Sequence, residues 1–378
     1  MSKKNAIVIG AGQTGRGYTA RYLFEKGYSI SFVDINEETV SFLKEDGAYS
    51  IHFYNKDRTP VFVHGFNTYR VGDAFLNHVL MEADLILTAV GEQNLGDISK
   101  WVVPGLKGKQ KRTVFMTCEN GTNPAKVLRQ HLQHLGLASE YTVSQTAVFC
   151  STVSIHETRL DILSQNETYF PYDHDELETL DFEGAVPVNN FEKFFERKIY
   201  TYNCLAGLIS YCGYVKGYEV YGDAANDPDI SATMDELLND LNPALQAYFE
   251  ITEADQVSFA NRALLKFKDK NILDYTIKNG RAPQRKLGPT ERIMSPIRIL
   301  RNNGKDIRVL EFVAAAALVY WQERQGISEP VLTKDPIAMF ASLNDLEMTD
   351  QIVLDVERYF KAILENREQV NVQEIIHS

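Results

Sequence analysis

The feature that most constrains the fold of this chain is a glycine turn near its start. Residues 6–9 (AIVI) are apolar and rich in β-branched side chains, as expected for a strand that is buried on both faces. Gly10, Gly12 and Gly15 follow with the spacing GxGxxG. Glycines at these positions permit a tight turn, close approach of a pyrophosphate to the backbone, and close packing of a helix on the strand. The pattern therefore predicts a dinucleotide-binding βαβ unit.

A second predicted strand, residues 29–34 (SISFVD), indicates which dinucleotide binds. It ends in Asp34, about 20 residues beyond the glycines, where a carboxylate can accept both hydroxyls of the adenosine ribose. The same charge would repel a 2′-phosphate, and no arginine follows directly to bind one. We therefore predict NAD as the cofactor. Its predicted binding residues are Gly10, Ala11, Gly12, Gln13, Thr14, Gly15, Asp34, Val90, Gly91 and Asn120.

Two further apolar segments extend the predicted sheet. Residues 83–95 contain a strand that ends at Val90 and Gly91, and residues 112–124 contain one that ends before Asn120. Ligands of open α/β sheets bind at the carboxyl ends of the strands. Asn120 is therefore a candidate to contact the nicotinamide or the substrate, with a capping or turn role as the alternative.

The chain is long enough for two domains, at 378 residues. Residues 48–71 alternate apolar and polar side chains around a polar turn, which predicts a β-hairpin within the first domain. After the connector at residues 183–190 the pattern becomes helical, and residues 312–321 (FVAAAALVYW) predict a buried central helix. We predict an α/β fold: a Rossmann-type NAD-binding domain, residues 1–188, followed by a mostly α-helical substrate and catalytic domain, residues 189–378.

Charge and composition narrow the range of partners. The net charge of −12 argues against nucleic acid or an anionic membrane surface, since both favour clustered lysine and arginine. No targeting segment or membrane-spanning run is visible, so we predict a cytoplasmic protein, monomeric or homodimeric, that acts on a small molecule. No cysteine and histidine cluster has metal-ligand spacing, so we predict no metal site.

The segment ERKIYTYNCLAG, residues 196–207, carries the candidate catalytic residues Lys198 and Asn203. On an ideal α-helix Tyr202 and Ala206 continue the face of Lys198, and Asn203 lies about 140° around the helix from it. A buried lysine with a lowered pKa can donate or accept a proton, and an amide can bind an oxygen that gains charge. The alternative is a lysine that snorkels to the surface and an amide with a structural role.

Segments spread along the chain resemble the polyol-specific long-chain dehydrogenase (mannitol dehydrogenase) family. The matching segments are GAGQTGRG (10–17), TAVG (88–91), CEN (118–120), ERKIYTYN (196–203), GYVKGY (213–218) and RKLGPTERIMSP (285–296). The resemblance implies a Rossmann domain followed by a helical domain, and metal-independent NAD(H) chemistry on a polyol or ketose. It also implies that Lys198 is the general acid and base and that Asn203 assists it.

The chain departs from the family pattern at two places. The family signature is Lys-x4-Asn-x2-His, and Ala206 stands at the histidine position. The family's Asp-Arg pair has no counterpart in residues 149–158. Both lost groups would touch the substrate rather than the cofactor.

A basic segment near residue 280 supplies candidate substrate ligands. Lys278 and Lys286 match family positions that bind the polyol chain, and Arg285 offers a planar fork for a phosphate or carboxylate. Together with Asn120 they are the predicted substrate-binding residues, and a sugar-alcohol phosphate such as mannitol 1-phosphate is the predicted substrate. The alternative for this segment is a solvated basic loop. The alternatives for the protein's function are a hexuronate (ketouronate) reductase of the same family and a non-catalytic NAD-binding sensor.

Overall fold

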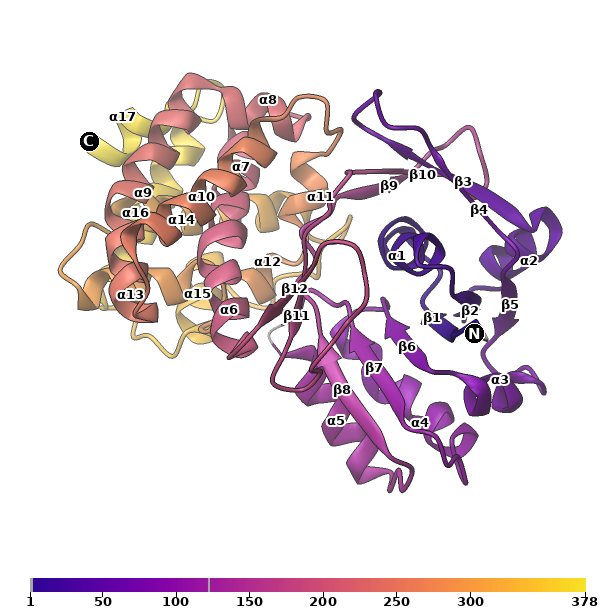
Figure 1. The fold of residues 1–378 in the computed structure, drawn as a ribbon. Helices are drawn as coiled ribbons and strands as arrows, with labels where there is room; N and C mark the ends of the chain where they lie inside the picture. Colours follow the sequence, from indigo (N-terminus) through magenta and orange to yellow (C-terminus); the bar gives the residue numbers. More distant parts are fainter. Residues whose placement is uncertain (1–2, 122) are drawn as a thin grey trace. The chain divides into compact units, whose positions relative to one another are not determined.

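The computed structural model describes residues 3–121 and 123–378 of the chain. These residues form two compact units, Met1–Phe195 and Glu196–Ser378 (Figure 1). The boundary expected from the sequence, between residues 188 and 189, stays a prediction.

A six-stranded parallel sheet forms the centre of the first unit (Figure 1). Its strands, in the order β5-β2-β1-β6-β7-β8, are Asn67–Arg70, Ser29–Asp34, Asn5–Ile9, Leu85–Thr88, Thr113–Thr117 and Tyr141–Gln145. Because β1 alternates faces, Ile7 and Ile9 enter one core and Ala6 and Val8 the other. The predicted Rossmann-type domain is confirmed.

Helices cover both faces of this sheet. Those that contribute to the core of Ile7 and Ile9 are α3 (Leu76–Glu82), α4 (Leu95–Gly105) and α5 (Pro124–His134). The π-helix η1 (Gly15–Thr19) and α1 (Ala20–Glu25) contribute to the core on the opposite face. Helix α2 (Glu37–Asp46) follows β2, and the 3-10 turn η2 (Glu92–Asn94) precedes α4.

A second sheet packs into the core on the α1 side. Its strands, in the order β4-β3-β10-β9, are Val61–His64, Ala48–Phe53, Ile162–Ser164 and Thr152–Ser154, and β11 (Phe170–Asp173) pairs separately with β12 (Ala185–Val188). The predicted hairpin is confirmed for β3 and β4, which pair antiparallel. It is wrong for the end of the segment, because β5 pairs in parallel with β2 in the main sheet.

The second unit is helical, as predicted, and its described residues contain no strand. Helix α6 (Phe191–Lys198) leads into it, and the elements that follow are η3 (Ile199–Asn203), α7 (Cys204–Val215), α8 (Tyr221–Asn226), α9 (Pro228–Phe249), α10 (Glu253–Lys268), α11 (Thr276–Gly280), α12 (Pro283–Lys286), α13 (Met294–Asn302), α14 (Arg308–Arg324), α15 (Pro336–Leu343), α16 (Gln351–Glu365) and α17 (Val372–His377). Helix α14 is buried on every side from Val309 to Trp321, which confirms the predicted central helix. Among the described residues, no helix has the length and apolar character needed to cross a membrane.

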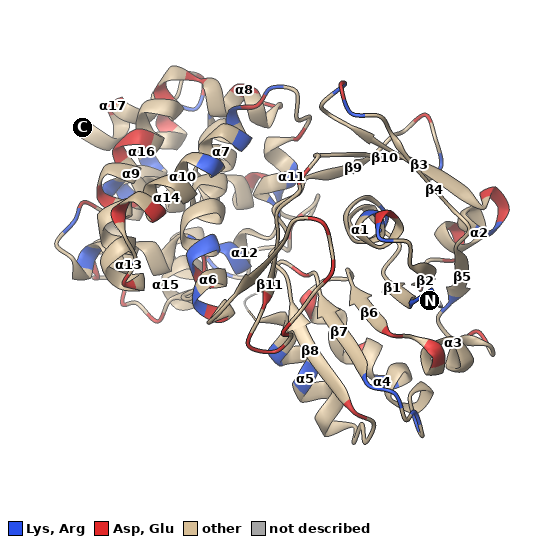
Figure 2. Ribbon diagram, viewed as in Figure 1, with Lys and Arg blue, Asp and Glu red and all other residues tan. Residues whose placement is uncertain are grey.

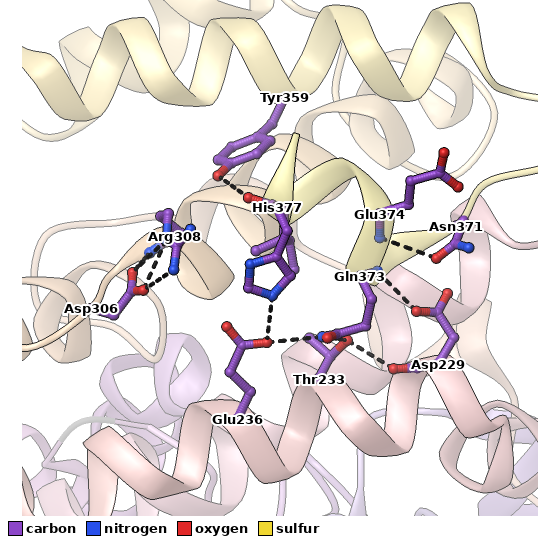
Figure 3. Close-up of polar contacts among 11 residues, drawn as sticks. Asp229, Thr233, Glu236, Asp306, Arg308, Tyr359, Asn371, Gln373, Glu374 and His377 are labelled. Atoms are coloured by element: carbon purple, nitrogen blue, oxygen red, sulfur yellow. Dashed lines mark hydrogen bonds and ion pairs between the residues drawn. The ribbon is translucent and has the colours of Figure 1, made fainter.

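Polar contacts fix the last helix, α17, onto the long helix α9 (Figure 3). The backbone N–H of Gln373 donates to Asp229 at 2.9 Å, and its side-chain amide donates to Thr233 at 2.9 Å. His377 lies 3.2 Å from Glu236, also on α9. These contacts hold α17 against α9 within the helical unit.

Candidate functional site

The glycine turn of the first unit is shaped by close backbone contacts. Gly10 has a φ of +96°, and a Cβ atom there would lie 2.5 Å from the carbonyl oxygen of Ala89. A Cβ atom on Gly15 would lie 1.8 Å from the carbonyl oxygen of Gly10. Only glycine fits at these two positions. A Cβ atom on Gly12 would meet nothing within 4 Å, so the backbone there faces open space in which a ligand could approach it.

Asp34 connects the end of β2 to this turn. One carboxylate oxygen accepts the backbone N–H of Ala11 at 2.6 Å, and the other accepts that of Asn36 at 2.8 Å. An ionised carboxylate has about four acceptor positions, so lone pairs remain for further donors. The residue thus has the location and the acceptor capacity that ribose hydroxyls require.

The remaining turn residues are held by the second sheet and by a buried arginine. The Gln13 amide donates to the Ser154 hydroxyl at 3.3 Å, and Thr14 directly precedes η1 without a capping side-chain bond. The guanidinium of Arg16, which is 5% exposed, donates to the carbonyl oxygens of Ala11 and Leu160. Burial lowers the pKa of Arg16. Arg16 therefore links the backbone of the glycine turn to that of Leu160.

A buried carboxylate joins the ends of β6 and β7. Glu119, 3% exposed, accepts the hydroxyl of Thr88 at 2.8 Å and the backbone N–H of Val90 at 3.1 Å. Burial raises the pKa of Glu119 to about 7. The sequence predicts a strand in this segment but gives Glu119 no role. It fixes Val90, next to Gly91, at the carboxyl edge of the sheet.

Asn120 follows this carboxylate and is exposed at the same edge. The side chain that caps α5 belongs to Asn123, which accepts the N–H of Lys126 at 3.2 Å. A cap of that helix is therefore not the role of Asn120.

A π-helical turn places the two candidate catalytic residues of the second unit. Lys198 ends α6, and the N–H of Cys204 then bonds to the carbonyl oxygen of Ile199, five residues earlier. Residues five apart share a face in such a turn, as residues four apart do in an α-helix. The expectation of a continuous α-helix is wrong here, and Lys198 and Asn203 come closer in direction than an ideal α-helix would allow.

Gln256 of α10, which is fully buried, fixes this turn. Its amide oxygen accepts the Nε–H of Arg197 at 2.9 Å, and its amide nitrogen donates to the hydroxyl of Thr201 at 3.2 Å. Arg197 also pairs with Asp255 at 2.9 Å. The residues on either side of Lys198 are thus anchored to a neighbouring helix.

Lys198 is 5% exposed, so its ammonium group is largely removed from water. Burial, together with the positive charges of Arg292 and Lys266, lowers the pKa of Lys198 to about 7, while Glu291 opposes the shift. A lysine with this pKa exchanges its proton near neutral pH. The snorkelling alternative requires an ammonium in water, which the burial contradicts.

Basic residues from α12 and the following loop lie in the electrostatic surroundings of Lys198, and Figure 2 shows blue segments on both α6 and α12. Lys286 is 6% exposed and donates to the carbonyl oxygen of Asn279. Burial, with Arg292 and Arg285 next in effect, lowers the pKa of Lys286 well below its usual range. Of the predicted residues, Arg285 and Lys286 belong to this group.

Glu291 binds two guanidinium groups at once. It pairs with Arg285, which is half exposed, and accepts the Nε–H of Arg292 at 3.1 Å. Although burial raises the pKa of Glu291, the charges of Arg292 and Arg285 lower it overall. Lys278 makes a separate ion pair with Asp274 at 3.4 Å. Arg292 lies in the segment 285–296 that resembles the family, but the sequence gives no sign that its side chain is buried.

Within residues 3–121 and 123–378, no group of three His, Cys, Asp or Glu side chains has an arrangement that could hold a metal ion.

Comparisons with known proteins match both units. Residues 4–166 match the Mannitol dehydrogenase Rossmann domain, and residues 190–376 match the Mannitol dehydrogenase C-terminal domain. A mannitol-1-phosphate 5-dehydrogenase of Enterococcus faecalis is 25% identical over 94% of this chain and 98% of its own. That of Geobacillus thermodenitrificans is 30% identical over 77% of this chain and 80% of its own.

Solved structures show the same fold. Mannitol 2-dehydrogenase of Pseudomonas fluorescens, solved as a ternary complex with NAD and D-mannitol, matches with a TM-score of 0.73 at 14% identity, covering 100% of this chain and 94% of that one. A D-sorbitol dehydrogenase in substrate-free form matches with a TM-score of 0.71 at 13% identity, covering 99% of this chain and 95% of that one.

Proposed function

Because the chain belongs to the mannitol dehydrogenase family, we propose that it interconverts a sugar-alcohol phosphate, such as mannitol 1-phosphate, and its ketose with NAD(H). The names of its relatives, mannitol-1-phosphate 5-dehydrogenases, support the substrate class. The observation that carries the chemistry is the buried Lys198, one π-helical turn before Asn203.

The residues of the glycine turn and the strand ends fit NAD. The open backbone at Gly12 would receive the pyrophosphate, and Asp34 would accept the ribose hydroxyls. Val90, Gly91 and Asn120, at the carboxyl edge of the sheet, would line the nicotinamide. When bound, NAD(H) supplies or accepts the hydride at the carbon that is reduced or oxidised.

Lys198 would exchange the proton with the substrate oxygen. In ketone reduction the ammonium donates a proton to the oxygen as it becomes an alkoxide, and in polyol oxidation the neutral amine accepts the hydroxyl proton. Because the pKa of Lys198 is lowered to about 7, both forms are populated near neutral pH.

Asn203 would donate a hydrogen bond to the same oxygen. The π-helical turn places it on the face of Lys198, so one oxygen could contact both side chains. Removal of a donor of this kind costs about 10²- to 10³-fold in turnover.

The basic residues would bind the anionic end of the substrate. The charge of Arg285 acts on Lys198, and Lys286 lies in the field of the same charged neighbours, Arg292 and Glu291. Lys278 lies on the preceding helix, α11. A phosphate, with more charge than a carboxylate, matches this excess of cations better. The same cations would also accept a carboxylate, so a hexuronate reductase is the second candidate.

A panel of ketose phosphates, free ketoses and ketouronates, assayed for NADH oxidation, tests the proposal. We expect the highest kcat/KM for a ketose phosphate, with Lys198→Met as the matched inactive control. A preference for a ketouronate would favour the second candidate. No oxidation of NADH with any compound, although NADH binds, would contradict both and favour the sensor.

A further inference from the structure

Arg292 stands out among the cations of the helical unit because its side chain is buried while part of its binding capacity is unused. The residue is 8% exposed, and its Nε–H is bound by Glu291 at 3.1 Å. Across the described parts of the chain, no hydrogen-bond acceptor contacts its two terminal nitrogens. These nitrogens are not among the fully buried atoms without a partner, so they keep contact with solvent and a ligand could reach them.

The side chain of Arg292 packs against α7, the helix that directly follows the catalytic turn. Its Cδ atom lies 3.6 Å from where a Cβ atom on Gly207 would be, so the side chain runs along the first turns of α7. There Ala206 and Gly207 have small side chains or none, and Asn203 lies one turn earlier. The charge of Arg292 acts on Lys198, on Lys286 and on the buried Tyr211 and Tyr221.

The charge balance of this region favours an anion. Glu291 is shared by Arg285 and Arg292, so these three side chains together carry one net positive charge. Lys198 and Lys286, both buried, lie in the field of the same two arginines. An oxygen-rich anion at Arg292 would relieve this excess and accept the unused N–H groups in a planar, two-point arrangement.

We propose that the terminal guanidinium nitrogens of Arg292, oriented by Glu291, bind the anionic group of the substrate beside Lys198. This inference rests on the proposed function and adds a residue to it. Arg292 then has two effects on one substrate: it fixes the anionic end, and its charge acts on the group that transfers the proton.

An anion bound at Arg292 should also change the protonation of Lys198. Its charged surroundings are Arg292, Lys266, Glu291 and Arg285. An anion that neutralises Arg292 removes part of the repulsion, so binding should raise the pKa of Lys198. The bound ketose phosphate would thereby favour the protonated lysine that ketone reduction requires.

Kinetics of Arg292→Met and Arg285→Met test the proposal, because each variant removes one of the two guanidinium partners of Glu291. Loss of a charge-assisted contact predicts a rise of about 10- to 100-fold in KM for the ketose phosphate in Arg292→Met, with a much smaller rise for the neutral ketose. Arg285→Met, which removes a half-exposed side chain, should have the smaller effect. The proposal would be overturned if Arg292→Met left the ratio of KM for the ketose phosphate to KM for the neutral ketose unchanged. A larger rise in KM for the ketose phosphate in Arg285→Met than in Arg292→Met would also overturn it.

Arg292→Lys separates charge from geometry. It keeps the positive charge but lacks the planar pair of donors, so the pH profile should stay close to that of the unmodified protein while KM stays raised. Full recovery of KM would refute binding through the guanidinium fork. Should Arg292→Met fail to fold, Glu291→Gln with Arg292→Met removes both charges together and gives the same readout.

A measurement without turnover keeps this inference distinct from the proposed function. The pH midpoint for dinitrophenylation of Lys198, followed by peptide mass spectrometry, should rise when inorganic phosphate is added to the unmodified protein. It should not rise in Arg292→Met, and it should still rise in Arg285→Met. A rise that persists in Arg292→Met would overturn the role of Arg292 even if the enzyme reduces ketose phosphates. If no ketose is reduced, the proposed function fails while this assay still decides the anion site.

Discussion

Replacement of Lys198 by methionine should stabilise the helical unit, and the gain should depend on pH. Burial lowers the pKa of this lysine from 10.5 to about 7, so the folded protein resists its protonation and the unfolded chain does not. At about 1.4 kcal/mol per pH unit, this difference costs about 5 kcal/mol below pH 7. Methionine has a similar length and no charge, so Lys198→Met avoids the cost.

The sign of the pH dependence follows from proton binding. Between pH 7 and pH 10.5 the unfolded chain holds the lysine proton and the folded protein does not, so the stability of the unmodified protein rises with pH in this window. The advantage of Lys198→Met should therefore shrink by about 3 kcal/mol from pH 7 to pH 9.5. The two proteins share every other titrating group, so the difference isolates Lys198.

Urea unfolding measures this difference. Trp321 of α14 is 1% exposed in the helical unit, so in a Trp101→Phe background its fluorescence reports on that unit alone. Lys270→Met, at a lysine whose side chain is 62% exposed, is the control, and its effect should not vary between the two pH values. A stability difference for Lys198→Met that is the same at pH 7 and pH 9.5 would refute the burial argument.

Three further predictions concern the cofactor, the substrate face and the sheet edge. Asp34→Ala should narrow the preference for NADH over NADPH, measured by fluorescence titration, and equal binding of both by the unmodified protein would contradict the role of Asp34. Ala206→His should lower turnover of the native substrate, because the imidazole enters the space beside Asn203, and restored or raised turnover in the steady-state assay would show instead that a donor was missing. Because burial raises the pKa of Glu119 from 4.5 to about 7, its charged form destabilises the fold as pH rises through this window. The free energy of unfolding of Glu119→Gln, measured with urea, should therefore rise by about 3 kcal/mol relative to that of the unmodified protein between pH 4.5 and pH 8. A difference in unfolding free energy that stays constant over this range would be inconsistent with the burial of this carboxylate.

The dinucleotide half of the protein could be predicted from the sequence because its signals are local. The spacing of Gly10, Gly12 and Gly15 and the position of Asp34 depend on one turn and two adjacent strands. The pairing of β5 with β2 in the main sheet could not be predicted, because the alternating pattern of residues 48–71 does not specify the partner strand.

The geometry of the catalytic turn could not be predicted from the sequence, for a different reason. A helical wheel assumes a constant rotation per residue, and the π-helical turn at Ile199–Asn203 adds a residue to that rotation. Its anchor, Gln256, lies more than 50 residues away along the chain. In the same way, Arg285 and Arg292 look alike in the sequence, and only the fold shows that one is half exposed and the other buried.

The most direct test of the account compares Lys198→Ala with the unmodified protein in two assays: NADH oxidation with a ketose phosphate, and NADH binding. We predict that the variant loses about 10²- to 10⁴-fold in turnover, the contribution of a general acid or base, while its NADH affinity stays within about twofold. Lys198 would act on the substrate oxygen and not on the dinucleotide. Substantial turnover in Lys198→Ala with NADH binding intact would contradict the proposed mechanism.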